Sequence, residues 1–316
     1  LSASDRALLK AMIALALLAL AFGIGYGAAT AAVRAGFIVL DPESGYRMMT
    51  LHGVTIFFYW LYFGQTALLL GLTVVHARRN HRLALAPAAW IGFALMVAGL
   101  VASQAGSWMG TPLLYDGSPE IVGEEKMWAG VFYVGYLLLG LGLFLLASAA
   151  IATALAGKRE DPERAWSTIG FGTVTWAGLL MVSAVATLNA FAPAALWALG
   201  WGEMPADHST GWHILFHNLH YLPLMGTVLA WYALVREMTG VGSIFGDRFS
   251  KVVFAFYLVF VPPTSLYHMF LEPGLAPLVL ALGSLLSLFI SVPTVAVFLV
   301  IVISLEAHAR ARGARG

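Results

Sequence analysis

The chain lacks cysteine altogether and carries little charge. None of its 316 residues is cysteine, and only 10% are Asp, Glu, Lys or Arg, against about 25% in soluble domains. The absence of cysteine excludes disulfides, thiolate metal sites and iron–sulfur clusters held by this chain. With 60% hydrophobic residues, we predict an integral membrane protein without a nucleic-acid partner. A metal or haem would need His, Tyr, Met or carboxylate ligands.

Hydrophobic runs of about 20 residues recur along the whole chain and predict an all-α polytopic membrane protein. We expect one membrane domain, 1–316, and no cleavable signal, because the first run continues at full membrane-spanning length. The fifth run is long and is a candidate for a break near Asn189–Pro193. The eight predicted transmembrane helices are approximately 9–33, 48–75, 86–106, 128–156, 168–199, 212–235, 252–270 and 278–305.

Basic residues are distributed unequally between the two sides that this topology creates. The N-terminus, the C-terminal tail and every second loop carry 14 of the 17 Lys and Arg residues, and only Arg34, Arg47 and Lys126 lie on the other side. Basic residues concentrate on the cytoplasmic side of membrane proteins. We therefore predict that both termini are cytoplasmic, in the inner (cytoplasmic) membrane of a bacterium or archaeon.

Three histidines and a tyrosine occupy one face of the sixth predicted helix, within Gly211–Tyr232. His213, His217 and His220 stand at i, i+4 and i+7, and Tyr221 follows the last of them, so these side chains share a helical face. Polar groups inside a bilayer are costly unless they face protein, metal or water. The alternatives are a functional site, or histidines that hydrogen-bond at the membrane interface or between helices.

Histidines on two other predicted helices lie at a similar depth near the outer side. His52 is about one turn into the second helix, and His268 is in the last turn of the seventh. Histidine is the usual axial ligand of haem in membrane cytochromes and a common copper ligand. Gly53 would let a large planar ring approach the backbone. His208 lies in an outer loop, where the sequence gives it no role.

Three sequence stretches resemble the haem-copper oxidases, most closely subunit I of their B-type branch. These are T-L-H-G-V in the second helix, H-N-L-H-Y in the sixth, and P-P-T-S-L-Y-H-M-F-L-E-P-G in the seventh. They occur in the family's order and on the matching helices. The resemblance covers roughly residues 10–316 and implies the fold of the first eight helices of subunit I.

The resemblance assigns roles to the cofactor ligands residue by residue. It implies that His52 is one axial ligand of a low-spin haem, which we expect to be haem b. His217 matches the first ligand of the copper that faces a high-spin haem, and His268 matches a second copper ligand. His220 is an additional candidate for that metal.

Further positions match the oxygen-reducing and proton-conducting parts of the family. Tyr221 matches the tyrosine that is covalently linked to the copper-ligating histidine and supplies a proton and an electron. The i, i+4 spacing of His217 and Tyr221 places both on one helical face, as such a linkage requires. Tyr232 and Thr294 match positions of the proton channel that approaches this site from the cytoplasm.

The chain also departs from the family pattern. Tyr267 stands where the family has the first histidine of a His-His pair, and Asn218 replaces a proline. The sequence given stops after the eighth helix, whereas helix 10 of the family ligates both haems. We therefore expect other membrane subunits, among them a chain that supplies helices 9–12 with haem-ligating histidines, and cytochrome c or quinone as redox partner.

Several functions remain open from the sequence. In one, two chains form a split oxidase that couples oxygen reduction to proton uptake. In another, a degenerate haem b subunit relays electrons to or from quinone or a redox partner without reducing oxygen; Tyr267 favours this version. A nitric oxide reductase relative would need a glutamate on the sixth helix, and none lies between Gly211 and Val235. A non-redox transporter or scaffold is the remaining class.

Overall fold

The protein is described by a computed structural model that covers residues 1–77, 80–265, 275–289 and 291–313. The regular structure in these ranges is helical and contains no strand. The elements are α1 (Ala3–Arg34), α2 (Pro42–Gly53), the π-helix η1 (Val54–Trp60), α3 (Leu61–Ala77), α4 (Ala86–Met109), the 3₁₀ turn η2 (Pro119–Ile121), α5 (Met127–Glu160), α6 (Thr168–Ala198), α7 (His208–Thr239), α8 (Gly246–Thr264), α9 (Pro277–Ser287) and α10 (Ser291–Ala311).

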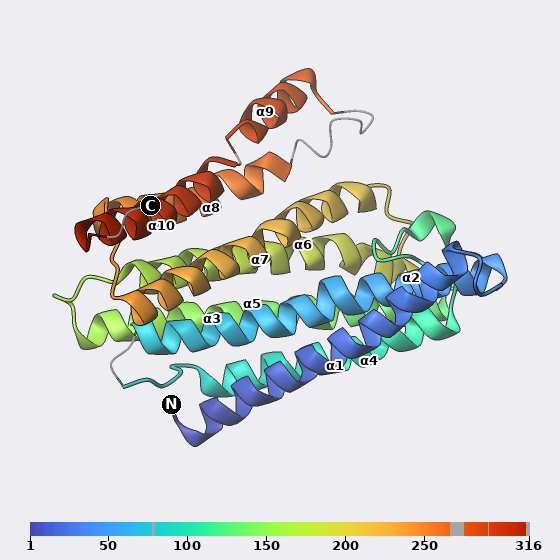
Figure 1. The fold of residues 1–316 in the computed structure, drawn as a ribbon. Helices are drawn as coiled ribbons and strands as arrows, with labels where there is room; N and C mark the ends of the chain where they lie inside the picture. Colours follow the sequence, from blue (N-terminus) through green and yellow to red (C-terminus); the bar gives the residue numbers. More distant parts are fainter. Residues whose placement is uncertain (78–79, 266–274, 290, 314–316) are drawn as a thin grey trace.

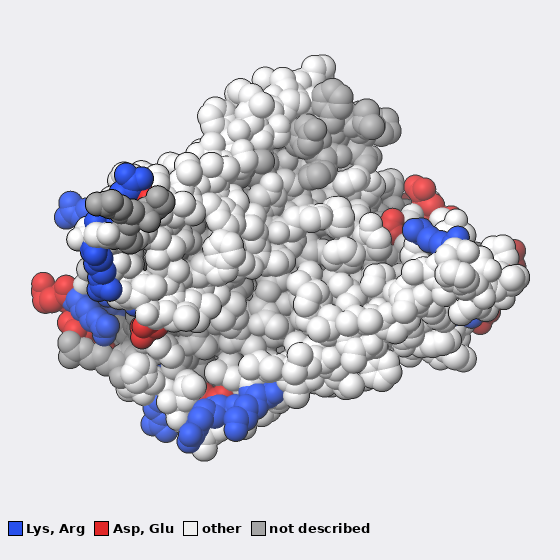
Figure 2. All heavy atoms as spheres, in the orientation of Figure 1, with Lys and Arg blue, Asp and Glu red and all other residues white. Residues whose placement is uncertain are grey.

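The long helices run side by side, and both chain ends lie toward the same end of the bundle (Figure 1). Charged side chains gather at its two ends, with a broad band free of charged side chains between them on this face (Figure 2). Six described helical segments are long and apolar enough to cross a membrane: α1, the continuous Pro42–Ala77, α4, α5, α6 and Pro277–Ala311. The all-α membrane fold is thereby confirmed. The count of eight spans and the cytoplasmic termini stay predictions.

Two predicted segments differ in detail from the helices observed. Pro193 lies inside α6, which is continuous from Thr168 to Ala198, so the chain does not break near Asn189–Pro193. The last predicted segment is divided instead, because α9 ends at Ser287 and α10 begins at Ser291. In membrane bundles, neighbouring helices can stabilise a helix that contains proline, which is why proline alone did not locate the break.

Glycines bring α4 and α5 into backbone contact. A Cβ added at Gly99 would lie 2.6 Å from the carbonyl oxygen of Gly135, and one at Gly92 would lie 2.8 Å from that of Gly142. Small residues at helix interfaces allow such close approach in membranes, where van der Waals packing drives helix association. These two helices therefore form a rigid pair behind the α2–α3 helix that carries the candidate haem ligand.

His208 connects three segments at the end of the bundle opposite the chain termini, a role that no sequence pattern predicts. The residue is buried at the start of α7, and its Nδ1 and Nε2 lie 3.1 Å from the Ala190 oxygen and 2.8 Å from the Asp116 oxygen. Carbonyl oxygens only accept, so a ring that donates from both nitrogens satisfies both contacts. His208 thus joins α6, α7 and the connection between α4 and α5. A buried loop histidine of this kind leaves no periodic signal in the sequence.

Asp116 lies in the connection between α4 and α5, and Asp41 in the connection between α1 and α2. We expect their contributions to the stability of the folded chain to change with pH in opposite directions. Burial raises the pKa of Asp116 above its ordinary 3.8, against smaller opposing effects that include His208. Hydrogen bonding to Ser44 lowers the pKa of Asp41. Just above pH 3.8 the folded chain binds more protons at Asp116 than the unfolded chain does, so this contribution to stability falls as pH rises. The contribution of Asp41 is present above its unfolded pKa and is lost as pH falls.

We therefore predict that Asp116→Asn raises the thermal unfolding midpoint at neutral pH, whereas Asp41→Asn lowers it. Asparagine remains a good helix cap, so Asp41→Asn tests the charge with little loss of the cap. The measurement is thermal unfolding of the detergent-solubilised protein from acidic to neutral pH. Shifts of the same sign for the two variants would contradict this assignment.

Candidate haem and metal site

His52 lies in the last turn of α2, with its imidazole against α1. The ring Nδ1 lies 2.8 Å from the carbonyl oxygen of Gly23. A carbonyl oxygen only accepts, so Nδ1 carries the proton and Nε2 keeps its lone pair. Ligating histidines in metalloproteins are commonly oriented by such a second bond. The residue predicted as an axial ligand is thus in the tautomer that iron coordination through Nε2 requires.

Glycines of α1 make room for this imidazole. A Cβ added at Gly27 would lie 2.7 Å from Cε1 of His52. Any larger residue at this position would push the ring away from the Gly23 carbonyl. On the other side, the planar ring that approaches Gly53 is that of Tyr115, whose Cδ1 would be 2.9 Å from an added Cβ. Gly53 therefore accommodates a tyrosine of the α4–α5 connection in the described structure.

Immediately after His52, the helix widens into the π-helix η1. Single stretches of π-helix are rare and frequently occur at functional sites. The widened turn carries the first part of the aromatic run, and Phe58 and Tyr59 are fully buried. Phe58 contacts the rings of Tyr136 and Trp212 at centroid distances of 4.6 and 5.9 Å. These aromatic contacts join η1, α5 and α7.

His217 and Tyr221 lie together on α7. Their ring centroids are 5.1 Å apart, with 43° between the ring planes. His217 is buried, and its Nε2 lies 3.2 Å from the Thr264 hydroxyl oxygen at the end of α8. The Thr264 hydroxyl donates to a backbone carbonyl of its own helix, so it accepts from the His217 ring. The i, i+4 pair thus has the side-by-side placement that its spacing predicts.

The other histidines of α7 lie in different surroundings. His220 is exposed, and its Nδ1 lies 2.8 Å from the Phe216 oxygen while its ring stands perpendicular to the Phe216 ring. His213 lies beside Ser209 on the wall of a polar cavity of about 370 Å³ at the outer end. The stripe predicted on one face therefore divides between the buried His217 with the half-buried Tyr221, a polar cavity beside His213, and the exposed His220.

The described ranges do not test the proposed copper ligands as a set. Within them, no group of three or more His, Asp or Glu side chains is placed to hold a metal ion. His268 and Tyr267 both lie outside the residues that the structure describes. The assignment of copper to His217, His268 and His220 therefore stays a prediction, whereas the arrangement of His52 fits an axial ligand of haem.

Hydroxyl groups line the opposite, more basic half of α7, α8 and α10. Tyr232 donates to Ser250 at 3.4 Å, and Ser250 donates to Ser243 at 3.0 Å. The hydroxyls of Tyr257 and Thr294 lie 3.0 Å apart. Tyr257 is fully buried. Tyr232 and Thr294 were expected from the sequence, but Tyr257 and Ser250 were missed because they lie in no recognisable motif.

The comparisons with known proteins agree with this arrangement. The family model described as Cytochrome C and Quinol oxidase polypeptide I matches residues 7–313. Cytochrome c oxidase subunit 1 of Thermus thermophilus is 24% identical over 281 residues, which cover 87% of this chain and 48% of that protein. A heme-copper terminal oxidase dimer solved by cryo-EM has the same fold, with a TM-score of 0.82 and 22% identity over 99% of this chain and 54% of the other.

The chain spans about half the length of the relatives that it matches. Its fold and its family are nevertheless clear, because the family model extends over almost every residue. The resemblance carried by the histidine-containing stretches is thereby confirmed at the level of the family. This integral membrane chain belongs to the Cytochrome C and Quinol oxidase polypeptide I family of respiratory oxidase subunits.

Proposed function

We propose that the protein is a membrane redox subunit that binds haem b through His52 and takes part in respiratory electron transfer. The observation that carries this proposal is the Nδ1 contact of His52 with the Gly23 oxygen, together with the space left by Gly27. Bound at this histidine, haem would supply one-electron chemistry. The protein's own contribution is to fix the imidazole and to surround it with buried aromatic side chains.

The open face of α7 supports assembly with further helices. His220, Thr227, Trp231 and Leu234 form an exposed face of this helix, although its opposite face is buried. Between α3 and α7 lies an apolar cavity of about 520 Å³, lined among others by Trp60, Gly64 and Trp231. We infer that further transmembrane helices cover this face, on the same polypeptide or on a partner chain, and supply the remaining haem ligands. The cytoplasmic membrane is the expected location.

The proposal of haem b binding and electron transfer can be extended to oxygen reduction. The buried His217 with the half-buried Tyr221 beside it supports this extension, because a phenol beside an imidazole can supply both a proton and an electron. Tyr267 favours the alternative, in which the subunit relays electrons between haem b and quinone or a redox protein without reducing oxygen. A phenol is a poor substitute for imidazole at copper, which prefers imidazole and sulfur ligands.

The copper content of the complex distinguishes an oxygen-reducing subunit from an electron-relay subunit. If the subunit belongs to an oxygen-reducing centre, elemental analysis of the purified assembled complex should find copper in a fixed ratio to this chain. That copper should be lost in His217→Ala and retained in His76→Ala, a histidine at the cytoplasmic end of α3. A copper-free complex that still contains haem would establish the electron-relay form instead.

The assignment of His52 is tested by substitution. We predict that His52→Ala abolishes the low-spin haem b bands in the reduced-minus-oxidised spectrum of the assembled complex, because no other nitrogen replaces Nε2 at the iron. His76→Ala serves as the control and should keep the bands. An unchanged spectrum in His52→Ala would refute the ligand assignment.

We also infer that the hydroxyl groups near the basic end carry protons inward. A cavity of about 30 Å³ lined by Tyr232, Ser243 and Ser304 has room for water. Tyr232 contacts Ser250, and Tyr257 contacts Thr294. Ser250, Tyr257 and Thr264 follow one another at seven-residue spacing on α8, and Thr264 contacts His217, which lies beside Tyr221. Hydrogen-bonded hydroxyls both donate and accept, so they can pass a proton along this series.

Removal of one hydroxyl should slow this transfer. We predict that Tyr257→Phe lowers the rate of proton uptake by roughly tenfold or more and leaves the haem spectrum unchanged. Tyr62→Phe is the matched control, because the Tyr62 hydroxyl is equally buried but makes no hydrogen bond within the described residues. The measurement is proton uptake by the reconstituted complex, followed with a pH-sensitive dye. Equal effects in the two variants would contradict the proposed path.

A further inference from the structure

Gln65 of α3 carries a buried amide that has no hydrogen-bond partner within the described part of the chain. The residue is 8% exposed, and neither its Nε2 nor its Oε1 makes a hydrogen bond there. Gln65 lies within Pro42–Ala77, a segment long and apolar enough to cross a membrane. The core of a bilayer contains no water to satisfy such groups, so an unpaired amide is costly. Gln65 therefore indicates a partner that the described residues do not supply.

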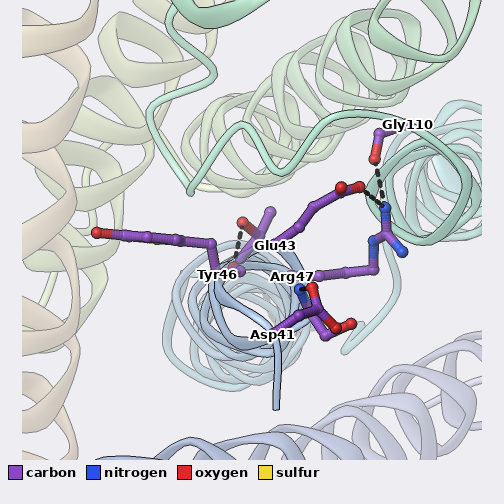
Figure 3. A network of polar contacts seen from close by, with 7 residues as sticks. Asp41, Glu43, Tyr46, Arg47 and Gly110 are labelled. Atoms are coloured by element: carbon purple, nitrogen blue, oxygen red, sulfur yellow. Dashed lines mark hydrogen bonds and ion pairs between the residues drawn. The ribbon is translucent and has the colours of Figure 1, made fainter.

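Other polar side chains of the same continuous helix are paired. Nη2 of Arg47 donates to Glu43 at 2.7 Å and to the Gly110 oxygen at 3.0 Å (Figure 3). The hydroxyl of Thr66, the residue that follows Gln65, donates to a carbonyl oxygen of its own helix at 2.6 Å. An amide with both of its polar atoms unpaired is thus an exception on this helix and needs an explanation.

Gln65 lines the apolar cavity of about 520 Å³ between α3 and α7. Trp176 of α6 forms another part of the wall, and its buried Nε1 also makes no hydrogen bond within the described residues. A Cβ added at Gly226 would lie 2.6 Å from Cζ2 of Trp176, so this glycine lets α7 pack closely on the indole. Two unpaired polar side chains from different helices therefore border one cavity.

The chemistry of the cavity wall selects its occupant. Among the described residues that line the cavity, none is charged, and an unpaired charge brought there would lose its hydration. An amide needs both a donor and an acceptor, and an indole N–H needs an acceptor. Hydroxyl and amide side chains provide both. Water is a poorer match, because a buried water needs two to four polar partners and this wall is mostly apolar.

Hydroxyl and amide side chains commonly form hydrogen bonds between transmembrane helices. The α7 side of the cavity is exposed at Thr227 and Leu234. We propose that the helix covering this face places a hydroxyl or amide side chain in the cavity, where it hydrogen-bonds to Gln65 and to the indole of Trp176. This inference rests on the proposed assembly with further helices. The contact lies roughly 20 Å along the helix from His52, so it fixes the covering helix at a second depth.

Photo-cross-linking tests which segment covers the cavity. A benzophenone amino acid in place of Leu68, which lines the cavity, should cross-link in the purified complex to an apolar segment with Ser, Thr, Asn or Gln at the contact. Mass spectrometry of the cross-linked peptide then shows whether this segment belongs to the same polypeptide or to a partner chain. The same amino acid in place of Leu17, which is exposed on α1, is the control and should not reach that segment.

The variant Gln65→Met tests the hydrogen bond itself with little change in side-chain size. When the complex is titrated with SDS, the cross-link from position 68 should be lost at a lower SDS fraction. The equilibrium constant of the helix contact should be roughly three- to tenfold smaller. Gln104→Met is the matched control, because the Gln104 amide donates to Thr55 at 2.9 Å within the chain, and it should leave this constant unchanged. Both variants should keep the haem b bands.

The possible failures of this inference and of the proposed function are distinguishable. An unchanged or larger constant in Gln65→Met would overturn the inference, because an amide that stays unpaired or binds only water is replaced by methionine without loss. Equal losses in Gln104→Met would overturn it as well, as would a cross-linked segment without a hydroxyl or amide side chain at the contact. A fully assembled wild-type complex in which no helix covers the cavity would overturn the proposed assembly itself.

Discussion

The bond between the His52 ring and the Gly23 carbonyl is the interaction on which the site depends. A histidine within a membrane helix must satisfy both of its nitrogens or expose them to a ligand. Here α1 satisfies Nδ1 at 2.8 Å and, through Gly27, allows the ring to lie close to its backbone. The packing of α1 on α2 therefore fixes the tautomer and direction of the one nitrogen that remains.

Around the contact between α1 and α2, closely packed helices differ from α7, which has one buried and one exposed face. The glycine contacts between α4 and α5 and the rings of Phe58, Tyr136 and Trp212 pack these helices closely together. By contrast, α7 combines a buried face with an exposed one, and its polar side chains lie on both. The buried His217 faces α8, with the half-buried Tyr221 beside it, whereas His220 lies on the exposed face, where we propose that further helices pack. This division explains how one helix can contribute both to an internal site and to an assembly surface.

The sequence predicted the helices well, because runs of apolar residues long enough to span a bilayer have few other structural explanations. The spacing of His217 and Tyr221 alone also predicted that the two side chains lie together, whereas the role of His52 as a haem ligand stays a proposal. The sequence could not predict contacts between helices distant in the chain, such as His52 with Gly23 or Tyr257 with Thr294, because spacing within one helix says nothing of its neighbours. His208 was overlooked for a related reason, since its burial depends on how a loop folds over α6. The prediction for His268 falls outside the described residues, and the metal site rests on the sequence alone.

The central claim is that this chain holds a low-spin haem b through His52 within a larger membrane complex. The most direct test is the reduced-minus-oxidised spectrum of the wild-type complex, purified through this chain and shown to be fully assembled. The account predicts haem b bands at a fixed ratio of haem to chain. A fully assembled but colourless complex would contradict it.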